Sequence, residues 1–307
     1  MSDRPYQICV RCVMDTTDPD IEFDAEGVCN HCRWYDANLE RRIILDPLER
    51  ERALNDYVAR IKADGRGKQY DCIIGVSGGV DSTYVAYLTK KLGLRPLAVH
   101  LDNGWNSGLA VKNIERVLRK LDIDLFTEVL DWEEFRELQR SFLYASTPDG
   151  EVPTDHAIYA VLMREAKRNG LRYIVNGRNF QTEGSRVVKW AYGHTDWRYI
   201  RGVHRRFGSV RLRTYPHYTL PQLAWATFAR RLRFLSILNY IDYQKEEAMS
   251  VLQNDLGWVY YGGKHYESIY TRFYQAYVLP EKFNIDKRRM HESDLIRSGQ
   301  TTRAVAL

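Results

Sequence analysis

The chain has 307 residues, of which 44% are hydrophobic and 12% aromatic, so it can bury a sizeable core in one large or two ordinary domains and is not disordered. No uninterrupted apolar stretch approaches the roughly 20 residues that a membrane helix needs, and the N-terminus lacks a signal-peptide pattern. We therefore expect a soluble, cytoplasmic protein with no membrane partner. The net charge of +5 suits an anionic small molecule as well as a nucleic acid, so charge alone does not identify the ligand.

Two C-x-x-C pairs lie within the first 32 residues, and 16 residues separate Cys12 from Cys29. Two such knuckles can bring four thiolates to one tetrahedral Zn²⁺, although an iron–sulfur cluster and a redox dithiol pair are alternatives. A closed four-sulfur site leaves no open coordination position, so we expect the metal to hold the module together. His31, inside the second pair, is interpreted as a bystander. The predicted zinc ligands are Cys9, Cys12, Cys29 and Cys32.

Beyond the cysteine pairs, helical and strand patterns alternate up to about residue 176. The predicted elements are a helix over 46–63, a strand over 70–76, a helix over 82–92, a strand over 95–101, a helix over 108–121, a strand over 125–130, a helix over 155–169 and a strand over 172–176. This alternation is typical of a doubly wound parallel sheet, whose ligands bind at the carboxyl ends of the strands. After about residue 185 the sequence becomes basic and aromatic, with helical runs near 219–236 and 242–256.

The stretch SGGVDS (77–82) lies between a predicted strand and a predicted helix. Gly78 and Gly79 let backbone N–H groups approach an anion, and the positive end of the following helix faces the same place. The two serines add hydroxyl donors, and Asp81 can hold Mg²⁺. The lysine and the spacing of the Walker P-loop are missing, so cleavage of a γ-phosphate is disfavoured.

In this position SGGVDS resembles the PP-loop of the ATP pyrophosphatase family, which includes asparagine, GMP and argininosuccinate synthetases and tRNA thiolases. Such enzymes cleave ATP between the α- and β-phosphates, adenylate an oxygen of the acceptor, and let a nitrogen or sulfur nucleophile displace AMP. HLDNGW (100–105) resembles the adenosine-binding segment of that family, which has an adenine nucleotide alpha hydrolase-like sheet; an ordinary polar loop is the alternative for each residue. The resemblance implies an ATP site at Ser77, Gly78, Gly79, Val80, Asp81, Ser82, His100, Asp102, Asn103 and Gly177.

Three further stretches bear on the acceptor: EVPTDHAI (151–158), NGRNFQTEG (176–184) and GWVYYGGKHYESIYTRFYQAYVLPEKFNIDKRR (257–289). Together with the cysteine pairs they resemble the N-acetyl sugar amidotransferase family, which converts a sugar acetamido group to an acetamidino group in O-antigen and flagellar glycan biosynthesis. The resemblance runs from about residue 7 to about residue 305. Family members commonly continue beyond SGQTTRAVAL (298–307), which looks like a helix that is cut short, so we expect a truncated chain or a short member.

The resemblance implies three parts: a zinc-binding module at 1–40, a PP-loop ATP pyrophosphatase domain at 41–190, and a helical substrate or partner segment at 191–307 packed on the sheet domain. It also implies that ATP adenylates the amide oxygen and that ammonia then displaces AMP. Mg²⁺ on Asp81 and the loop amides would stabilise phosphate charge with Lys264 or Lys282. Two roles are ranked equally for Glu183 and Glu267: binding a second Mg²⁺, or taking a proton from the incoming ammonia.

The expected substrate is an anionic acetamido sugar or nucleotide sugar. Its predicted contacts are Thr154, Asp155, His156, Asn176, Arg178, Asn179 and Arg272, each with a capped helix or a solvated charged face as the alternative. We find no glutaminase domain in the sequence. The resemblance therefore implies a separate glutaminase subunit like that of imidazole glycerol phosphate synthase, sometimes accompanied by a cyclase-like subunit, as the ammonia donor.

A tRNA-thiolating enzyme is the main alternative, because several carry zinc knuckles beside a PP-loop. The basic and aromatic stretch at 197–218 suits an RNA surface, a solvated face or a pocket for an anionic nucleotide sugar, and its arginines are Arg198, Arg201, Arg205, Arg206, Arg211 and Arg213. Thiolation generally needs catalytic cysteines, and only Cys72 remains, in a predicted buried strand. Nucleic-acid binding is therefore disfavoured. The intact SGGVDS also disfavours a non-enzymatic zinc adaptor.

Overall fold

The centre of the protein is a five-stranded sheet in which every strand runs parallel to its neighbours. The structure, a computed structural model, describes residues 4–185 and 187–307. The strands follow the order β3-β2-β1-β4-β5, with Cys72 opposite Pro96 and Ile73 opposite Ile174. Their bounds are β1 Cys72–Gly75, β2 Pro96–Asp102, β3 Leu125–Val129, β4 Tyr173–Asn176 and β5 Arg233–Ser236. This arrangement confirms the predicted doubly wound parallel sheet.

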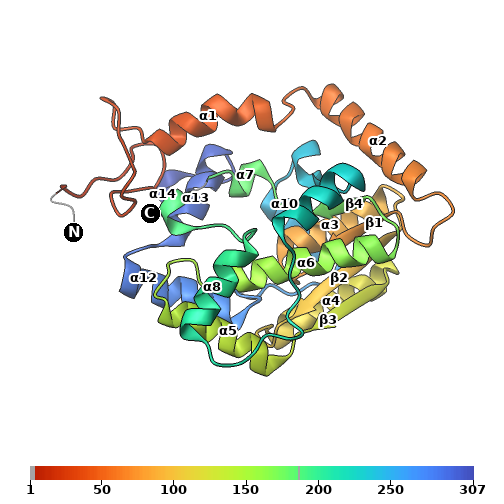
Figure 1. The fold of residues 1–307 in the computed structure, drawn as a ribbon. Helices are drawn as coiled ribbons and strands as arrows, with labels where there is room; N and C mark the ends of the chain where they lie inside the picture. The colour runs from red at the N-terminus through yellow and green to blue at the C-terminus, as the bar shows by residue number, and fades with distance from the viewer. Residues whose placement is uncertain (1–3, 186) are drawn as a thin grey trace.

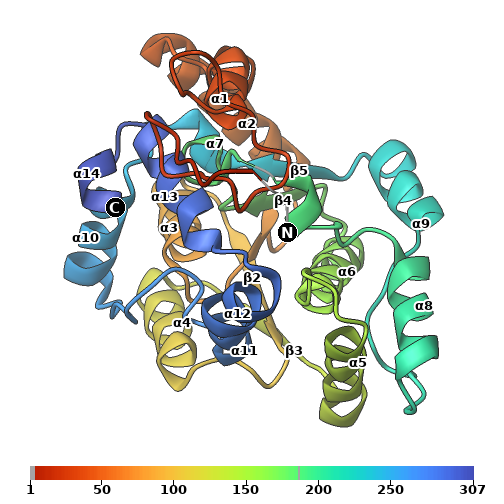
Figure 2. The same ribbon diagram turned by 90° about the vertical axis from the view of Figure 1, so that its left-hand side faces the viewer.

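Helices cover both faces of the sheet (Figures 1 and 2). Successive side chains of a strand point to opposite faces, so Cys72 and Ile74 enter one core and Ile73 enters the other. The first core contains residues of α2 Pro47–Asp64, α3 Val80–Lys91, α4 Gly108–Leu121 and α10 Lys245–Leu256. The second is built mainly on α6 Val152–Arg168, and α5 Trp132–Tyr144 packs with α8 Trp197–Phe207 beside it. No element was predicted for the stretch that forms α5.

The chain changes face between β1 and β4. The connections after β1 and β2 pass through α3 and α4 on one face, whereas the connection from β3 to β4 passes through α6 on the other. The loops after β1 and β4 therefore diverge, which is where doubly wound sheets bind their ligands. A cavity lined by Gly79 and Gly177 lies at this point.

The fifth strand contradicts the helix predicted over 219–236. Only α9 Leu220–Ala224 and a π-helical turn over Trp225–Ala229 are helical there, and β5 follows. Leu235 enters the core under α3 while Phe234 packs on the α6 side, so the segment alternates between faces as a strand does. Parallel pairing with β4 outweighs the helical spacing of the apolar residues.

The two ends of the chain pack together at the left of Figure 1. Arg303 Nε donates hydrogen bonds to the carbonyl oxygens of Cys9 and Cys12, at 3.0 and 3.1 Å. The helices of this part of the molecule are α1 Asn30–Arg42, α11 Ile269–Phe273, α12 Leu279–Phe283, α13 Lys287–Arg297 and α14 Arg303–Ala306, and the short α7 Phe180–Glu183 packs against α13. Among the described residues, no helix combines the length and the apolar character needed to cross a bilayer.

Candidate functional site

The glycine-rich loop between β1 and α3 has a shape that requires glycine. Gly78 has φ of +82°, and a Cβ there would lie 2.7 Å from the carbonyl oxygen of Ala110. Trp258 donates its indole N–H to the carbonyl oxygen of Gly78 at 2.9 Å, and Ser77 Oγ accepts a hydrogen bond from the N–H of Gly79 at 3.3 Å. Contacts from α4 and from the segment after α10 therefore fix the loop.

The N-terminus of α3 borders the cavity beside the loop, which Gly79, Val80 and Asp81 help to line. Its N-cap residue is Gly79, and no side chain caps the helix. The first N–H groups of a helix have no partner within the helix, and the helix dipole gives this end a partial positive charge. Ser77 Oγ and Ser82 Oγ lie 3.1 Å apart beside it and can donate to the same anion. The loop is thus shaped and charged to hold phosphate oxygens.

Two carboxylates and a lysine meet beside this loop. Asp81 in the first turn of α3 accepts a hydrogen bond from the hydroxyl of Tyr243, and Glu183 of α7 lies 3.0 Å from Lys264 Nζ. Desolvation raises the pKa of Asp81, the charge of Glu183 raises it further, and Lys264 opposes both effects. Desolvation also opposes ionisation of Glu183, but Lys264, His265 and Arg178 together outweigh it and lower the pKa of Glu183.

These side chains line a cavity of about 200 Å³ that also contains Gly177 and Glu267. Glu267 Oε2 is buried and has no hydrogen-bond partner among the described residues. A buried carboxylate oxygen without a partner is costly, so the site suits a ligand that supplies one. Carboxylate oxygens are also the ligands that Mg²⁺ prefers, and it commonly uses one or two of them with substrate phosphates. Asp81 and Glu183, together with the orphaned oxygen of Glu267, therefore fit Mg²⁺ and a nucleoside triphosphate.

A second cavity, of about 730 Å³, adjoins the first. Lys245, Tyr260, Gly263 and Lys264 line both cavities. The larger cavity has an excess of basic side chains over the acidic Asp286 and Glu292; they are Lys245, Lys264, Arg272, Lys287, Arg288 and Arg289. Several of these are paired with carboxylates, but the guanidinium of Arg272 lies over the ring of Tyr266, 4.6 Å from its centroid. The cavity therefore suits an anionic ligand placed next to the phosphate site.

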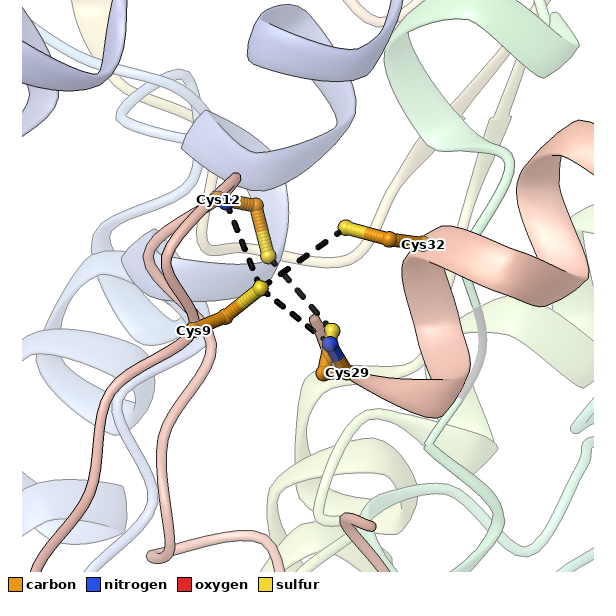
Figure 3. Close-up of side chains that lie close together, drawn as sticks. All are labelled: Cys9, Cys12, Cys29 and Cys32. Carbon is orange, nitrogen blue, oxygen red and sulfur yellow. Dashed lines mark hydrogen bonds between the residues drawn. The ribbon is translucent and has the colours of Figure 1, made fainter. Parts of the chain in front are cut away.

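The four N-terminal cysteines converge on one point (Figure 3). Their sulfur atoms lie within 4.8 Å of one another, with Cys9 and Cys32 at 4.0 Å and Cys12 and Cys29 at 3.7 Å. A tetrahedral ion with Zn–S bonds of about 2.3 Å places its sulfurs about 3.8 Å apart, so the cluster fits Zn²⁺. His31 instead pairs with Asp18 at 2.6 Å.

The C-terminal residues that line these cavities match a known family. Residues 267–307 match the family model described as LPS biosynthesis protein WbpG-like, C-terminal domain. The matched segment is similar to that domain. The match supports the family predicted from the sequence. The WbpG-like segment includes Glu267 and Arg272 of the cavities and all of α13.

Three solved structures show a low overall similarity to this chain. NMN synthetase from Francisella tularensis is 14% identical, with 78% of this chain and 97% of that chain covered and a TM-score of 0.35. NH3-dependent NAD synthetase from Campylobacter jejuni is 13% identical, with 69% of this chain and 94% of that chain covered and a TM-score of 0.34. A predicted subunit of tRNA methyltransferase from Methanocaldococcus jannaschii is 14% identical, with 59% of this chain and 73% of that chain covered and a TM-score of 0.34. No curated protein matches the sequence.

The residues predicted to contact adenosine hold the ends of β1 and β2 together. His100 is buried; its Nδ1 lies 2.9 Å from the carbonyl oxygen of Val76, and its Nε2 lies 3.2 Å from Asn106 Nδ2. Asp102 Oδ1 accepts a hydrogen bond from the N–H of Gly104 at 3.0 Å. Asn103 Nδ2 lies 3.4 Å from the hydroxyl of Thr154. Contact with adenosine therefore stays a prediction for this loop.

Most predicted substrate residues do not line either cavity. His156 is completely buried, stacks on Tyr218 with ring centroids 4.3 Å apart, and has both ring nitrogens engaged, so the structure gives it a packing role and not substrate contact. Asn179 is buried as the N-cap of α7, and Asn176 Oδ1 accepts hydrogen bonds from the N–H of Arg178 and the hydroxyl of Ser236. Thr154, Asp155 and Arg178 lie outside both linings, whereas Arg272 lies in the larger cavity.

Among the predicted lysines, Lys264 lies at the centre of the site and Lys282 does not. Lys282 is exposed on α12, over the ring of Phe283, and lines neither cavity. The structure instead brings Lys245 to both cavities, a residue that was not predicted. Lys245 is the first residue of α10, after β5. Recognition of β5 as a strand would have placed this segment at the carboxyl edge of the sheet.

The larger cavity also contains His291, which was not predicted. Desolvation and the neighbouring Lys264, His265, Lys287 and Lys245 lower its pKa well below the usual value, so its imidazole is neutral.

The arginine-rich stretch lies away from both cavities. All six of its arginines are exposed, and Arg201, Arg205 and Arg211 line a separate shallow groove beside α8. This position does not support a role in the cavity beside the glycine loop. Cys72 is fully buried in β1, and burial raises the pKa of its thiol, so it is poorly suited to act as a nucleophile.

Proposed function

We propose that the protein is an ATP-dependent amidotransferase that converts a sugar acetamido group to an acetamidino group, in lipopolysaccharide O-antigen or related surface-glycan biosynthesis. One observation carries the proposal: Lys264 joins a small acidic cavity at the glycine loop to a larger basic cavity. The first suits a nucleoside triphosphate with Mg²⁺, and the second suits an anionic acceptor. The WbpG-like match at 267–307 supports the same pathway.

The proposed reaction has two steps. The acetamido oxygen attacks the α-phosphorus of ATP, the bond to the β-phosphate oxygen breaks, pyrophosphate leaves, and the amide nitrogen loses its proton. Ammonia then attacks the imidate carbon, the C–O bond breaks, and AMP departs with the former amide oxygen. The product is an acetamidino group.

The residues of the small cavity have distinct roles in this scheme. The loop and the N-terminus of α3 hold the phosphates, and Lys264 offsets the negative charge that develops on pyrophosphate. Mg²⁺ bound by Asp81 and Glu183 would supply further charge stabilisation. Desolvation opposes ionisation of Glu267, but His265 at 3.8 Å and the hydrogen bonds to the carboxylate together lower its pKa, and in this scheme Glu267 accepts the proton that the attacking ammonia loses.

The larger cavity would hold the sugar substrate. Its basic lining favours an anionic acetamido sugar or nucleotide sugar, and Arg272 is a contact for the anionic group. A separate glutaminase subunit, with or without a cyclase-like subunit, would deliver ammonia. The thiolation alternative lacks an available nucleophile, because Cys72 is fully buried.

The test follows the oxygen atom. Purified protein is incubated with ATP, Mg²⁺, ammonium and nucleotide-linked acetamido sugars that carry heavy oxygen in the acetamido group. We expect sugar-dependent pyrophosphate release, heavy oxygen in AMP, and an amidine product in the mass spectrum. Asp81→Asn should lower the rate by about 100-fold or more, while Lys282→Ala should leave it unchanged. AMP without heavy oxygen, or turnover with glutamine and no partner, would contradict the scheme.

A further inference from the structure

A fully buried arginine connects the cysteine cluster to the rest of the protein. The Arg297 side chain is 0% exposed, and its Nε and Nη2 lie 3.4 Å from the sulfurs of Cys32 and Cys12. A Zn²⁺ ion with four thiolates carries two net negative charges, so a buried guanidinium beside it is favourable. The contact spans most of the sequence, with separations of 265 and 285 residues.

The opposite side of the same guanidinium holds the segment after α7. Arg297 Nη1 donates to Asp294 Oδ1 at 2.8 Å and also to the hydroxyl of Ser185. Asp294 in turn accepts from the N–H and the hydroxyl of Ser185, at 3.1 and 2.5 Å. Because the guanidinium is planar, its donors cannot move independently, so a shift at the sulfurs also shifts its contact with Ser185.

Ser185 lies two residues after Glu183, the carboxylate paired with Lys264 in the small cavity. Helix α7 has only four residues, too few to hold its own conformation. Its other end is also fixed by the N-terminal module, because Phe180 stacks on Tyr35 of α1 with ring centroids 4.7 Å apart. Both ends of the segment that carries Glu183 therefore depend on contacts with the cysteine module or its partner helix α13.

We propose that Arg297 is a positioning residue that couples the metal state of the cysteine cluster to Glu183, so that zinc occupancy and Mg-ATP binding favour each other. The proposal rests on the ATP use inferred above. Loss of the metal removes the thiolate partners of Arg297 and leaves only Asp294 as its charged partner, which loosens Ser185 and displaces Glu183. Because coupling between two sites is reciprocal, Mg-ATP binding also strengthens metal retention.

The test uses cobalt in place of zinc, since the thiolate-to-cobalt bands report the geometry of the cluster. In the full chain, we expect Mg-ATP to shift these bands and to slow metal loss to a chelator by roughly fivefold or more. Arg297→Lys keeps the charge but loses the planar fork, and Ser185→Ala removes the contact near Glu183. Each should retain cobalt, lose the spectral shift and bind Mg-ATP roughly fivefold more weakly.

Arg303→Lys is the matched control. Arg303 also contacts the cysteine module, but its hydrogen bonds go to the carbonyl oxygens of Cys9 and Cys12 and not to Ser185, so this variant should keep the shift. Binding of Mg-ATP without a spectral shift in the unaltered protein, or a shift retained in both Arg297→Lys and Ser185→Ala, would overturn the coupling alone. Absence of Mg-ATP binding would overturn the proposed function as well.

Discussion

Gly177 lies directly against the backbone of Asp81. A Cβ atom at position 177 would lie 2.9 Å from the carbonyl carbon of Asp81 and 3.0 Å from its Cβ. The loop after β4 and the first turn of α3 therefore meet without room for a side chain. This contact sets the width of the crevice in which the phosphate site is formed.

The first prediction concerns this contact. Gly177→Ala should destabilise the protein by about 1–3 kcal/mol and weaken ATP binding, because the new methyl group pushes α3 away from β4. Gly202→Ala on the exposed side of α8 is the control; nothing lies within 4 Å of its added Cβ, and it should stabilise the helix slightly. Chemical unfolding and nucleotide titration measure both effects. Normal nucleotide binding by Gly177→Ala would show that the crevice can widen freely.

The second prediction concerns pH. Desolvation and Glu183 raise the pKa of Asp81, whereas Lys264, the hydrogen bond from Tyr243 and Lys245 lower it. Only the ionised carboxylate holds a cation, so Mg²⁺-dependent nucleotide binding should be present above this raised pKa and be lost as pH falls through it. Tyr243→Phe removes a contribution that lowers the pKa, so the loss should occur at higher pH.

Nucleotide titrations across a pH series check this shift. Tyr84→Phe is the control, because the ring of Tyr84 packs near Tyr243 but its hydroxyl does not bond to Asp81. If Tyr243→Phe and the unaltered protein lost nucleotide binding at the same low pH, Asp81 would not control cation binding.

The third prediction separates amidation from thiolation. Cys72→Ala should retain amidotransferase activity and zinc content and lose only about 1 kcal/mol of stability, since the thiol is a small buried core group. Cys29→Ser should lose the metal and destabilise the N-terminal module. Metal analysis and turnover assays distinguish the two variants. Loss of activity in a folded Cys72→Ala protein would instead favour sulfur transfer.

The fourth prediction compares two basic residues of the C-terminal segment. Arg272→Ala should raise the KM for the sugar by about tenfold, corresponding to loss of one charge-assisted contact, with little change in kcat. Lys282→Ala should change neither value, because Lys282 is exposed outside both cavities. Steady-state kinetics with saturating ATP measures the difference. Equal effects of the two substitutions would indicate a general effect of surface charge.

Local patterns predicted strands β1 to β4 and the helices α2, α3, α4 and α6, but not α1 or α5. The strand before SGGVDS and the helix after it are both present, because glycines, caps and apolar spacing are encoded within a few residues. The four cysteines were likewise predictable as one cluster from their spacing alone. The fold class and the position of the glycine loop therefore follow from the sequence.

The parts of the fold and of the site that the sequence did not predict depend on contacts between segments far apart in the chain. Phe234 and Leu235 form a strand only because β4 offers an edge to pair with, which helical spacing does not reveal. His156 looked like a ligand at a helix start but is enclosed by aromatic rings contributed from elsewhere in the chain. Lys245 reaches both cavities only once β5 is in place. Such placements come from tertiary packing, and no single stretch encodes them.

The contact between Arg297 and the cysteine sulfurs also has a consequence for biosynthesis. A ribosome releases the cysteine pairs first, and Arg297 emerges only after a further 265 residues beyond Cys32. Throughout that interval the thiols are without the helix that covers them, and the segment carrying Glu183 is without its anchor. Until α13 has been synthesised, therefore, no buried guanidinium stabilises the thiolates or anchors the segment that carries Glu183.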